Sequence, residues 1–181
     1  IVSGFHTDPV GLLLSHRADW AIVSEIEHND DVIFKPLFSY EMVGICSKNH
    51  SLAEKDIWEA EDFIDETWVT YPVPDDMLDL WRKVLKSKGI NPTRRTTELT
   101  IAMIQLVASR RGIATIPYWA ALPYLEKGYV VARKVTKEGL YSNLYAAIRK
   151  EDESLSYLED FYQTVKSQSF STLPGLSVLN L

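Results

Sequence analysis

The sequence lacks the features that mark disulfide-stapled, zinc-binding and membrane-spanning proteins. Its 181 residues include one cysteine, Cys46, so no disulfide can form within the chain. No CxxC pair or His-Cys cluster is present, and we therefore predict no metal site. No apolar run approaches the ~20 residues that a membrane-spanning helix requires, so we expect no membrane partner. The first residues also lack the basic start and long apolar stretch of a signal peptide, which favours a cytoplasmic protein.

Positive charge is in short supply. Lysine and arginine number 19 against 25 aspartate and glutamate residues, for a net charge of −6. An acidic domain of this kind is a poor sole partner for DNA or anionic lipid, because it lacks the cations that would neutralise phosphate. A basic region elsewhere in a longer protein would have to supply them.

Motifs of catalysis and phosphate binding are missing as well. The chain has no GxSxG nucleophile elbow, no GxxxxGK[ST] loop and no GxGxxG turn. Its four histidines, His6, His16, His28 and His50, are scattered, and we expect them on loops or exposed helix turns. Only His6, in a strand-to-helix loop, is a candidate ligand contact. We therefore predict no catalytic residues and no cofactor.

The sequence does contain a regular alternation of strand and helix patterns. Asp8, followed by proline, predicts the start of a helix, and the short apolar run within residues 18–25 is typical of a buried parallel strand. Residues 75–88 predict an amphipathic helix that Gly89 ends, and Gly112 is expected to end a later helix in a left-handed conformation. Alternating strands and helices predict an α/β fold with a mostly parallel sheet.

Two prolines directly after a central strand, in the stretch YPVP, suggest that the chain crosses between two lobes. A late strand, within NLYAAIRK, suggests a crossing back. We place the first lobe at 1–70 with 145–171, the second lobe at 71–144, and a C-terminal tail at 172–181.

Polar and aromatic residues gather where the predicted strands end, which is where open α/β sheets bind ligands. Each has an ordinary structural explanation, since threonines cap helices and aromatic rings fill cores; as a set they predict a cleft for a small molecule. A helix start among them would offer free amides to a carboxylate. The predicted effector-binding residues are Phe5, His6, Thr7, Ser24, Thr70, Tyr71, Glu98, Thr100, Thr115, Pro117 and Tyr118.

Three stretches resemble the effector-binding domain of LysR-type bacterial transcriptional regulators. They are GLLLSHRADWAIVSE (11–25), PLFSYEMVGICSKNHSLA (36–53) and IQLVASRRGIATIP (104–117). The resemblance implies two Rossmann-like lobes, as in type 2 periplasmic binding proteins, that hold an effector between them. It also implies a homodimer or homotetramer, and promoter DNA bound by a winged helix-turn-helix that is absent from this chain. The first lobe would be incomplete at its N-terminus, because the family's first strand and helix are absent too.

Further stretches, among them FHTDP (5–9), VTYPV (69–73) and LDLWRKVL (78–85), resemble the regulators of methionine biosynthesis that respond to homocysteine. The implied co-effector is homocysteine or a related amino acid. Its thiol end would lie on an aromatic ring. We expect its carboxylate to bind the helix-start amides together with Thr100, Thr7 or Thr70. Its ammonium group would bind Glu98, Glu25 or Asp8, with no preference among the three. Its thiol would lie against Phe5, Tyr71 or Tyr118.

The chain departs from the family pattern at Arg110, where a G-x-G motif has its first glycine. Two other classes of protein remain open at this point. One is the solute-binding protein of a transporter, and the other is an enzyme on the same two-lobed fold. Both are weighed against a ligand-sensing domain that performs no chemistry.

Overall fold

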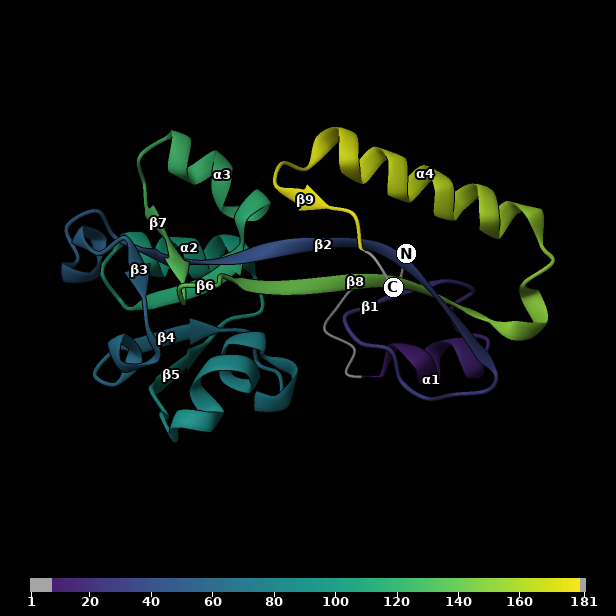
Figure 1. The fold of residues 1–181 in the computed structure, drawn as a ribbon, viewed down its shortest axis with the longest axis horizontal. Coiled ribbons are helices and arrows are strands. Elements are labelled where there is room, and N and C mark those ends of the chain that lie inside the picture. The colour runs from purple at the N-terminus through teal and green to yellow at the C-terminus, as the bar shows by residue number, and fades with distance from the viewer. Residues whose placement is uncertain (1–7, 180–181) are drawn as a thin grey trace. The chain divides into compact units, whose positions relative to one another are not determined.

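The structure is a computed structural model that describes residues 8–179. The chain divides into two compact units, Ile1–Tyr40 with Ser142–Leu181 and Glu41–Tyr141. Strands β2 (Val32–Cys46) and β8 (Leu140–Arg149) contribute to both units (Figure 1). The chain therefore passes between units within these two strands, and the first passage precedes the division at residues 70 and 71 that the sequence suggested.

The first unit contains the short helix α1 (Pro9–Leu14) and strand β1 (Ala21–Val23). The Asp8 carboxylate accepts a hydrogen bond from the Gly11 amide at 2.7 Å, which caps α1 as predicted. Strand β1 pairs with β8 in the antiparallel direction, so the parallel strand expected from its apolar run is wrong in direction. Its middle residue, Ile22, is 49% exposed, so the burial expected of this run is not met either. A short apolar run does not by itself fix the direction of pairing.

Helix α4 (Ser156–Thr172) is the longest helix of the first unit, and β9 (Leu176–Ser177) follows it. The Tyr162 hydroxyl of α4 donates to the Pro36 carbonyl at 2.7 Å, which ties the helix to β2. Part of the expected tail is ordered by the sheet, since β9 pairs with Ser39 and Tyr40 of β2.

The second unit holds a mixed sheet with helices α2 (Thr100–Ala108) and α3 (Tyr118–Glu126). Its strands, besides part of β2, are β3 (Ile57–Trp58), β4 (Thr67–Thr70), β5 (Thr93–Thr96), β6 (Ile113–Pro117) and β7 (Val131–Val135). Strand β4 runs parallel to β5 and β6, whereas β2 pairs antiparallel with β6 and β7. The sheet is therefore mixed rather than mostly parallel, because β2 enters it in the opposite direction.

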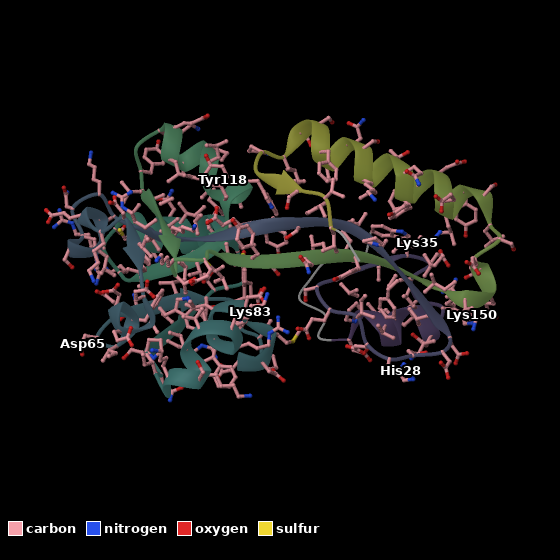
Figure 2. All side chains as sticks on the ribbon, in the orientation of Figure 1. His28, Lys35, Asp65, Lys83, Tyr118 and Lys150 are labelled. Atoms are coloured by element: carbon pink, nitrogen blue, oxygen red, sulfur yellow. The ribbon has the colours of Figure 1, made fainter. Side chains whose placement is uncertain are left out.

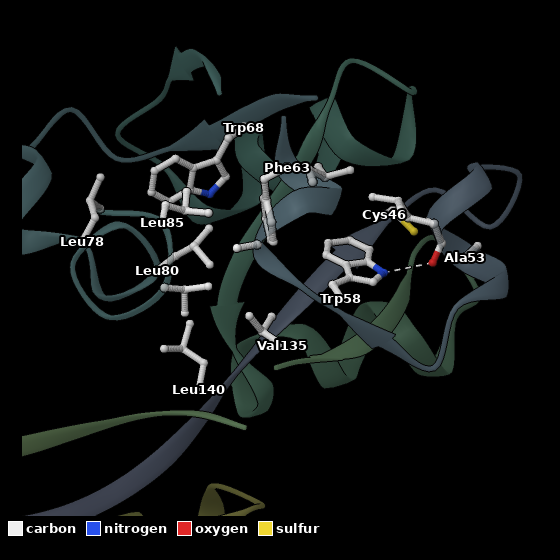
Figure 3. Close-up of a cluster of buried hydrophobic side chains, with 14 residues drawn as sticks. Cys46, Ala53, Trp58, Phe63, Trp68, Leu78, Leu80, Leu85, Val135 and Leu140 are labelled. Carbon is white, nitrogen blue, oxygen red and sulfur yellow. Dashed lines mark hydrogen bonds between the residues drawn. The ribbon is translucent and has the colours of Figure 1, made fainter. Parts of the chain in front are cut away.

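Two apolar clusters form the core of the second unit. One is built around Trp58, Phe63 and Trp68 (Figure 3). The Trp58 indole donates to the Leu52 carbonyl at 2.9 Å and fills the space over Gly44, where an added Cβ would lie 2.3 Å from the ring. The other cluster packs α2 and α3 against β6; its buried members are Val43, Ile45, Val69, Met103, Ile104, Val107, Ala114, Ile116, Ala121 and Val130.

The amphipathic helix expected at 75–88 begins later than predicted: its backbone is continuously helical over residues 79–88, with irregular helical geometry. A 3₁₀ turn at Asp75–Met77 is followed by an extended Leu78, a π-helical turn at Trp81–Leu85 and a 3₁₀ turn at Lys86–Lys88. Gly89 ends this segment with φ 66°, as the sequence predicted. Among residues 8–179, no helix is long and apolar enough to cross a membrane.

Helix α2 ends earlier than predicted, at Ala108, and its left-handed terminal residue is Arg110 with φ 58°. The Arg110 amide donates to Val107 and the Arg111 amide donates to Leu106, the two bonds of a Schellman motif. Gly112 has φ 142° instead, and an added Cβ there would lie 2.2 Å from the backbone oxygen of Thr67. Gly112 is therefore required for its close approach to β4 and not for helix termination.

Candidate functional site

One edge of the second unit collects five of the predicted effector-binding residues. Because β4, β5 and β6 are parallel, their carboxyl ends meet at the same edge, and α2 and α3 begin there. Figure 2 shows Tyr118, the first residue of α3, in this unit. The residues at this edge are Thr70, Tyr71, Thr100, Pro117 and Tyr118.

A short hydrogen bond joins the end of β4 to the start of α2. The Tyr71 and Thr100 hydroxyl oxygens lie 2.6 Å apart, in a partly buried setting. A backbone bond adds to this connection, since the Thr97 amide donates to the Thr70 carbonyl at 3.0 Å. The loop that leads into α2 is thus fixed to the neighbouring strand end at two points.

Arg94 of β5 braces the same strand end. Its guanidinium donates to the Tyr71 and Val73 carbonyls at 3.3 Å, pairs with the Asp75 carboxylate, and lies 5.9 Å from the centre of the Trp68 ring. The Tyr71 ring packs against the cluster formed by α2, α3 and β6. Tyr71 is therefore held through both its backbone and its ring.

The start of α2 presents free backbone amides at this edge. The first bond across a helical turn runs from the Met103 amide to the Leu99 carbonyl at 3.0 Å, so the amides of residues 100–102 precede the intrahelical ladder. No side chain in the described part of the chain caps them. Together with the helix dipole they favour a carboxylate or another anion. Leu99 and Ile101 beside them are 62% and 54% exposed, which leaves apolar surface next to the polar groups.

The remaining predicted residues are placed differently. Thr115 lies within β6, opposite Gly44 of β2, rather than at the strand end, and its side chain is buried, as is that of Thr70 at the end of β4. Glu98 is exposed in the loop before α2, and Ser24 is exposed after β1 in the first unit. Phe5, His6 and Thr7 lie outside the described residues. Their roles stay predictions.

The first unit contains a buried cation that sequence patterns did not reveal. Arg149 is 7% exposed and donates to the Leu13 and Ala18 carbonyls and to the carboxylates of Asp19 and Asp152. Its hydrogen bond with Asp19 raises the pKa of the guanidinium, against burial, which lowers it. With every group satisfied, Arg149 is a structural brace. Its signal in the sequence is a lone arginine directly after the apolar run at 144–148.

Surface pockets of the first unit do not coincide with the predicted residues. One is lined by Leu14, His16, Asp31, Arg149, Lys150 and Glu151, and another by Arg17, Ala18, Asp19, Trp20, Tyr157, Leu158 and Phe161. Within the described range 8–179, no three His, Cys, Asp or Glu side chains are grouped so that they could hold a metal ion. The candidate site is therefore assigned to the edge of the second unit on its side chains and helix start, where the predicted residues gather.

Comparisons with known proteins agree on one family. Residues 1–169 match the family model described as LysR substrate binding domain. The HTH-type transcriptional regulator MetR of Escherichia coli (strain K12) is 34% identical over 172 residues, which cover 95% of this chain and 54% of that protein. MetR of Salmonella typhimurium is likewise 34% identical over 172 residues, with the same coverage. The chain thus spans about half the length of the curated relatives it matches.

Solved structures agree in fold. The regulatory domain of MetR, a LysR family regulator from N. meningitidis, has a TM-score of 0.94 at 64% identity, covering 99% of this chain and 83% of that one. The effector binding domain of QuiR in complex with shikimate has a TM-score of 0.71 at 23% identity, covering 88% of this chain and 77% of that one. At that identity the second likeness bears on the fold alone.

Proposed function

Because the chain belongs to the LysR substrate-binding domain family, we propose that it senses a small effector for a transcriptional regulator, and that the effector is homocysteine or a related amino acid. The family assignment confirms the resemblance and the two-lobed α/β fold class predicted from the sequence. The relatives are transcriptional regulators and not enzymes. The transporter and enzyme alternatives therefore lose their support.

One observation carries the choice of site: a helix start with free amides lies beside hydroxyls and aromatic rings at a shared strand edge. The carboxylate of the effector binds the first amides of α2 and the Thr100 hydroxyl. The sulfur end rests on the ring of Tyr71 or Tyr118, since thiols and thioethers pack favourably on aromatic faces. The MetR names of relatives at 34% and 64% identity support an amino acid of methionine metabolism as the ligand.

The effector acts without chemistry, by favouring one conformation of the domain. A tenfold to hundredfold preference, about 1.4–2.8 kcal/mol, is enough for a graded switch. The signal reaches promoter DNA through a winged helix-turn-helix outside this chain, in a homodimer or homotetramer. The protein then works in the cytoplasm on genes of methionine biosynthesis.

A calorimetric titration tests the ligand. Homocysteine, methionine and cysteine are titrated separately into the chain, and thermal unfolding is followed at each concentration. We expect homocysteine to bind and to raise the unfolding temperature more than the other two. If millimolar homocysteine produces no heat of binding and no rise in the unfolding temperature, the proposal is wrong.

A further inference from the structure

We propose that the Tyr71 hydroxyl is a positioning group that acts on the effector through Thr100 and not by direct contact. The inference rests on the proposed function, because it assigns the Thr100 hydroxyl to the effector's carboxylate. It adds a role that neither the fold nor the family match assigns. The Tyr71 hydroxyl holds the Thr100 side chain in one rotamer and directs its proton toward the ligand.

The geometry of the pair supports this direction. At 2.6 Å the two oxygens lie at the short end of the range for O–H···O bonds, so one hydroxyl donates to the other. Each hydroxyl has one proton and two acceptor positions. If Tyr71 donates to Thr100, the Thr100 proton remains for an acceptor beyond the helix start. A carboxylate bound at the helix start favours this direction over the reverse. The Tyr71 hydroxyl then donates to Thr100, the Thr100 hydroxyl donates to the carboxylate, and both hydrogen bonds point toward the negative charge.

The surroundings hold the Tyr71 side chain in place, whereas the Thr100 side chain needs a partner to fix its rotamer. Tyr71 is fixed by the Arg94 bond to its carbonyl and by its ring in the core, as described above. Thr100 is the first residue of α2, and among residues 8–179 no side chain caps the start of this helix. A threonine side chain in that position rotates among staggered rotamers unless something holds it. The phenol therefore supplies the order that the helix start lacks.

Deleting only the phenol oxygen tests this role. Tyr71→Phe keeps the ring and its packing, and we expect homocysteine to bind 3- to 10-fold more weakly to that variant. Thr100→Val removes the hydroxyl with little change of shape and should weaken binding at least as much. In the Thr100→Val background, Tyr71→Phe should have no further effect, because the group through which it acts is gone.

A second pair of variants separates positioning from general stability. Thr100→Ser keeps a hydroxyl, so it should retain binding and also the sensitivity to Tyr71→Phe. Tyr124→Phe removes a hydroxyl from another ring that packs on the same cluster, and it should leave the affinity unchanged. Thermal unfolding of each variant shows that the domain is intact.

The outcomes are distinct for the two proposals. If the wild-type chain binds homocysteine and Tyr71→Phe binds it equally well, the positioning role is wrong while the proposed function stands. If the losses of Tyr71→Phe and Thr100→Val multiply in the double variant, the Tyr71 hydroxyl contacts the effector directly and the inference is also wrong. If the wild-type chain binds no homocysteine, the proposed function itself fails.

Discussion

The Arg149 guanidinium donates a hydrogen bond to the Asp19 carboxylate at 2.7 Å, across 130 positions of sequence. The same guanidinium reaches the Leu13 carbonyl at the end of α1 at 2.9 Å. One buried side chain thus connects β8 to the helix and loop that precede β1. The segment is also held by the Trp20 ring, which packs edge-on against Phe161 at 5.0 Å, and Arg149 adds the polar link to β8.

Replacing Arg149 with lysine should destabilise the first unit by about 2 kcal/mol. Lysine keeps the charge but cannot donate in several directions from a planar group, so the bonds to the two carbonyls and the two carboxylates cannot all be kept. The estimate is kept low because the Asp19 side chain is 65% exposed and solvent screens the pair. Urea unfolding gives the free energy. The control is Lys150→Met, because Lys150 is the next residue and is exposed. Equal unfolding midpoints for the two variants would contradict the bracing role of Arg149.

Arg110→Gly should stabilise the domain by about 0.5–1 kcal/mol. Arg110 occupies the left-handed position that ends α2, where a side chain costs about 1 kcal/mol and glycine costs little. Helix α3 ends with the same two backbone bonds around Gly128, which has φ 66°. Thermal unfolding should show a higher midpoint for the variant. A lower midpoint would mean that the arginine makes compensating contacts.

Gly112→Ala should destabilise the second unit by more than about 2 kcal/mol. The added Cβ would meet the Thr67 carbonyl oxygen at 2.2 Å, and backbone atoms of a central strand cannot move aside without disturbing the sheet. Gly89→Ala is the matched control: it also stands at positive φ, but nothing lies within 4 Å of its Cβ position. That control should lose only about 1 kcal/mol. Equal losses in urea unfolding would argue that φ alone matters at Gly112.

Local signals in the sequence were enough for most elements and for bringing several candidate residues to one edge, whose part in binding stays a prediction. The cap at Asp8, the stop at Gly89 and strand β6 followed from side-chain chemistry within a few residues. The edge with Thr70, Tyr71 and Thr100 followed from parallel strand ends, which needs only the order of the elements. Features decided by distant partners were missed.

Three features show what local patterns cannot provide. The antiparallel pairing of β1 depends on β8, more than a hundred positions away in the sequence. The function of Gly112 depends on the Thr67 carbonyl, which local composition does not reveal, so the residue was taken for a helix stop. Thr115 faces the interior because of its register with Gly44, although it stands near a strand end.

Cys46, the single cysteine, is fully buried at the end of β2. Burial raises the pKa of its thiol from about 9 to about 11, although nearby Arg133 lowers it in part. The folded protein therefore keeps the proton on sulfur in a range where the unfolded chain releases it. At neutral pH the thiol is expected to be inert toward thiol reagents until the domain unfolds.

The stability of the domain should consequently fall as pH rises from about 9 to about 11. Below pH 9 the thiol is protonated in both the folded and the unfolded state, so it contributes no pH dependence. Between the two pKa values the unfolded state binds fewer protons than the folded state. The free energy of unfolding therefore falls as pH rises in this range. A shift of this size corresponds to about 3 kcal/mol in full, of which about 2 kcal/mol is lost by pH 11, where the folded thiol is half ionised. Other groups also titrate at alkaline pH, so the measurement is a difference. Wild type and Cys46→Ala are unfolded with urea at pH 8, 9, 10 and 11, and the stability advantage of wild type should shrink by that amount. Parallel curves for the two proteins would show that the thiol ionises as readily when folded as when unfolded.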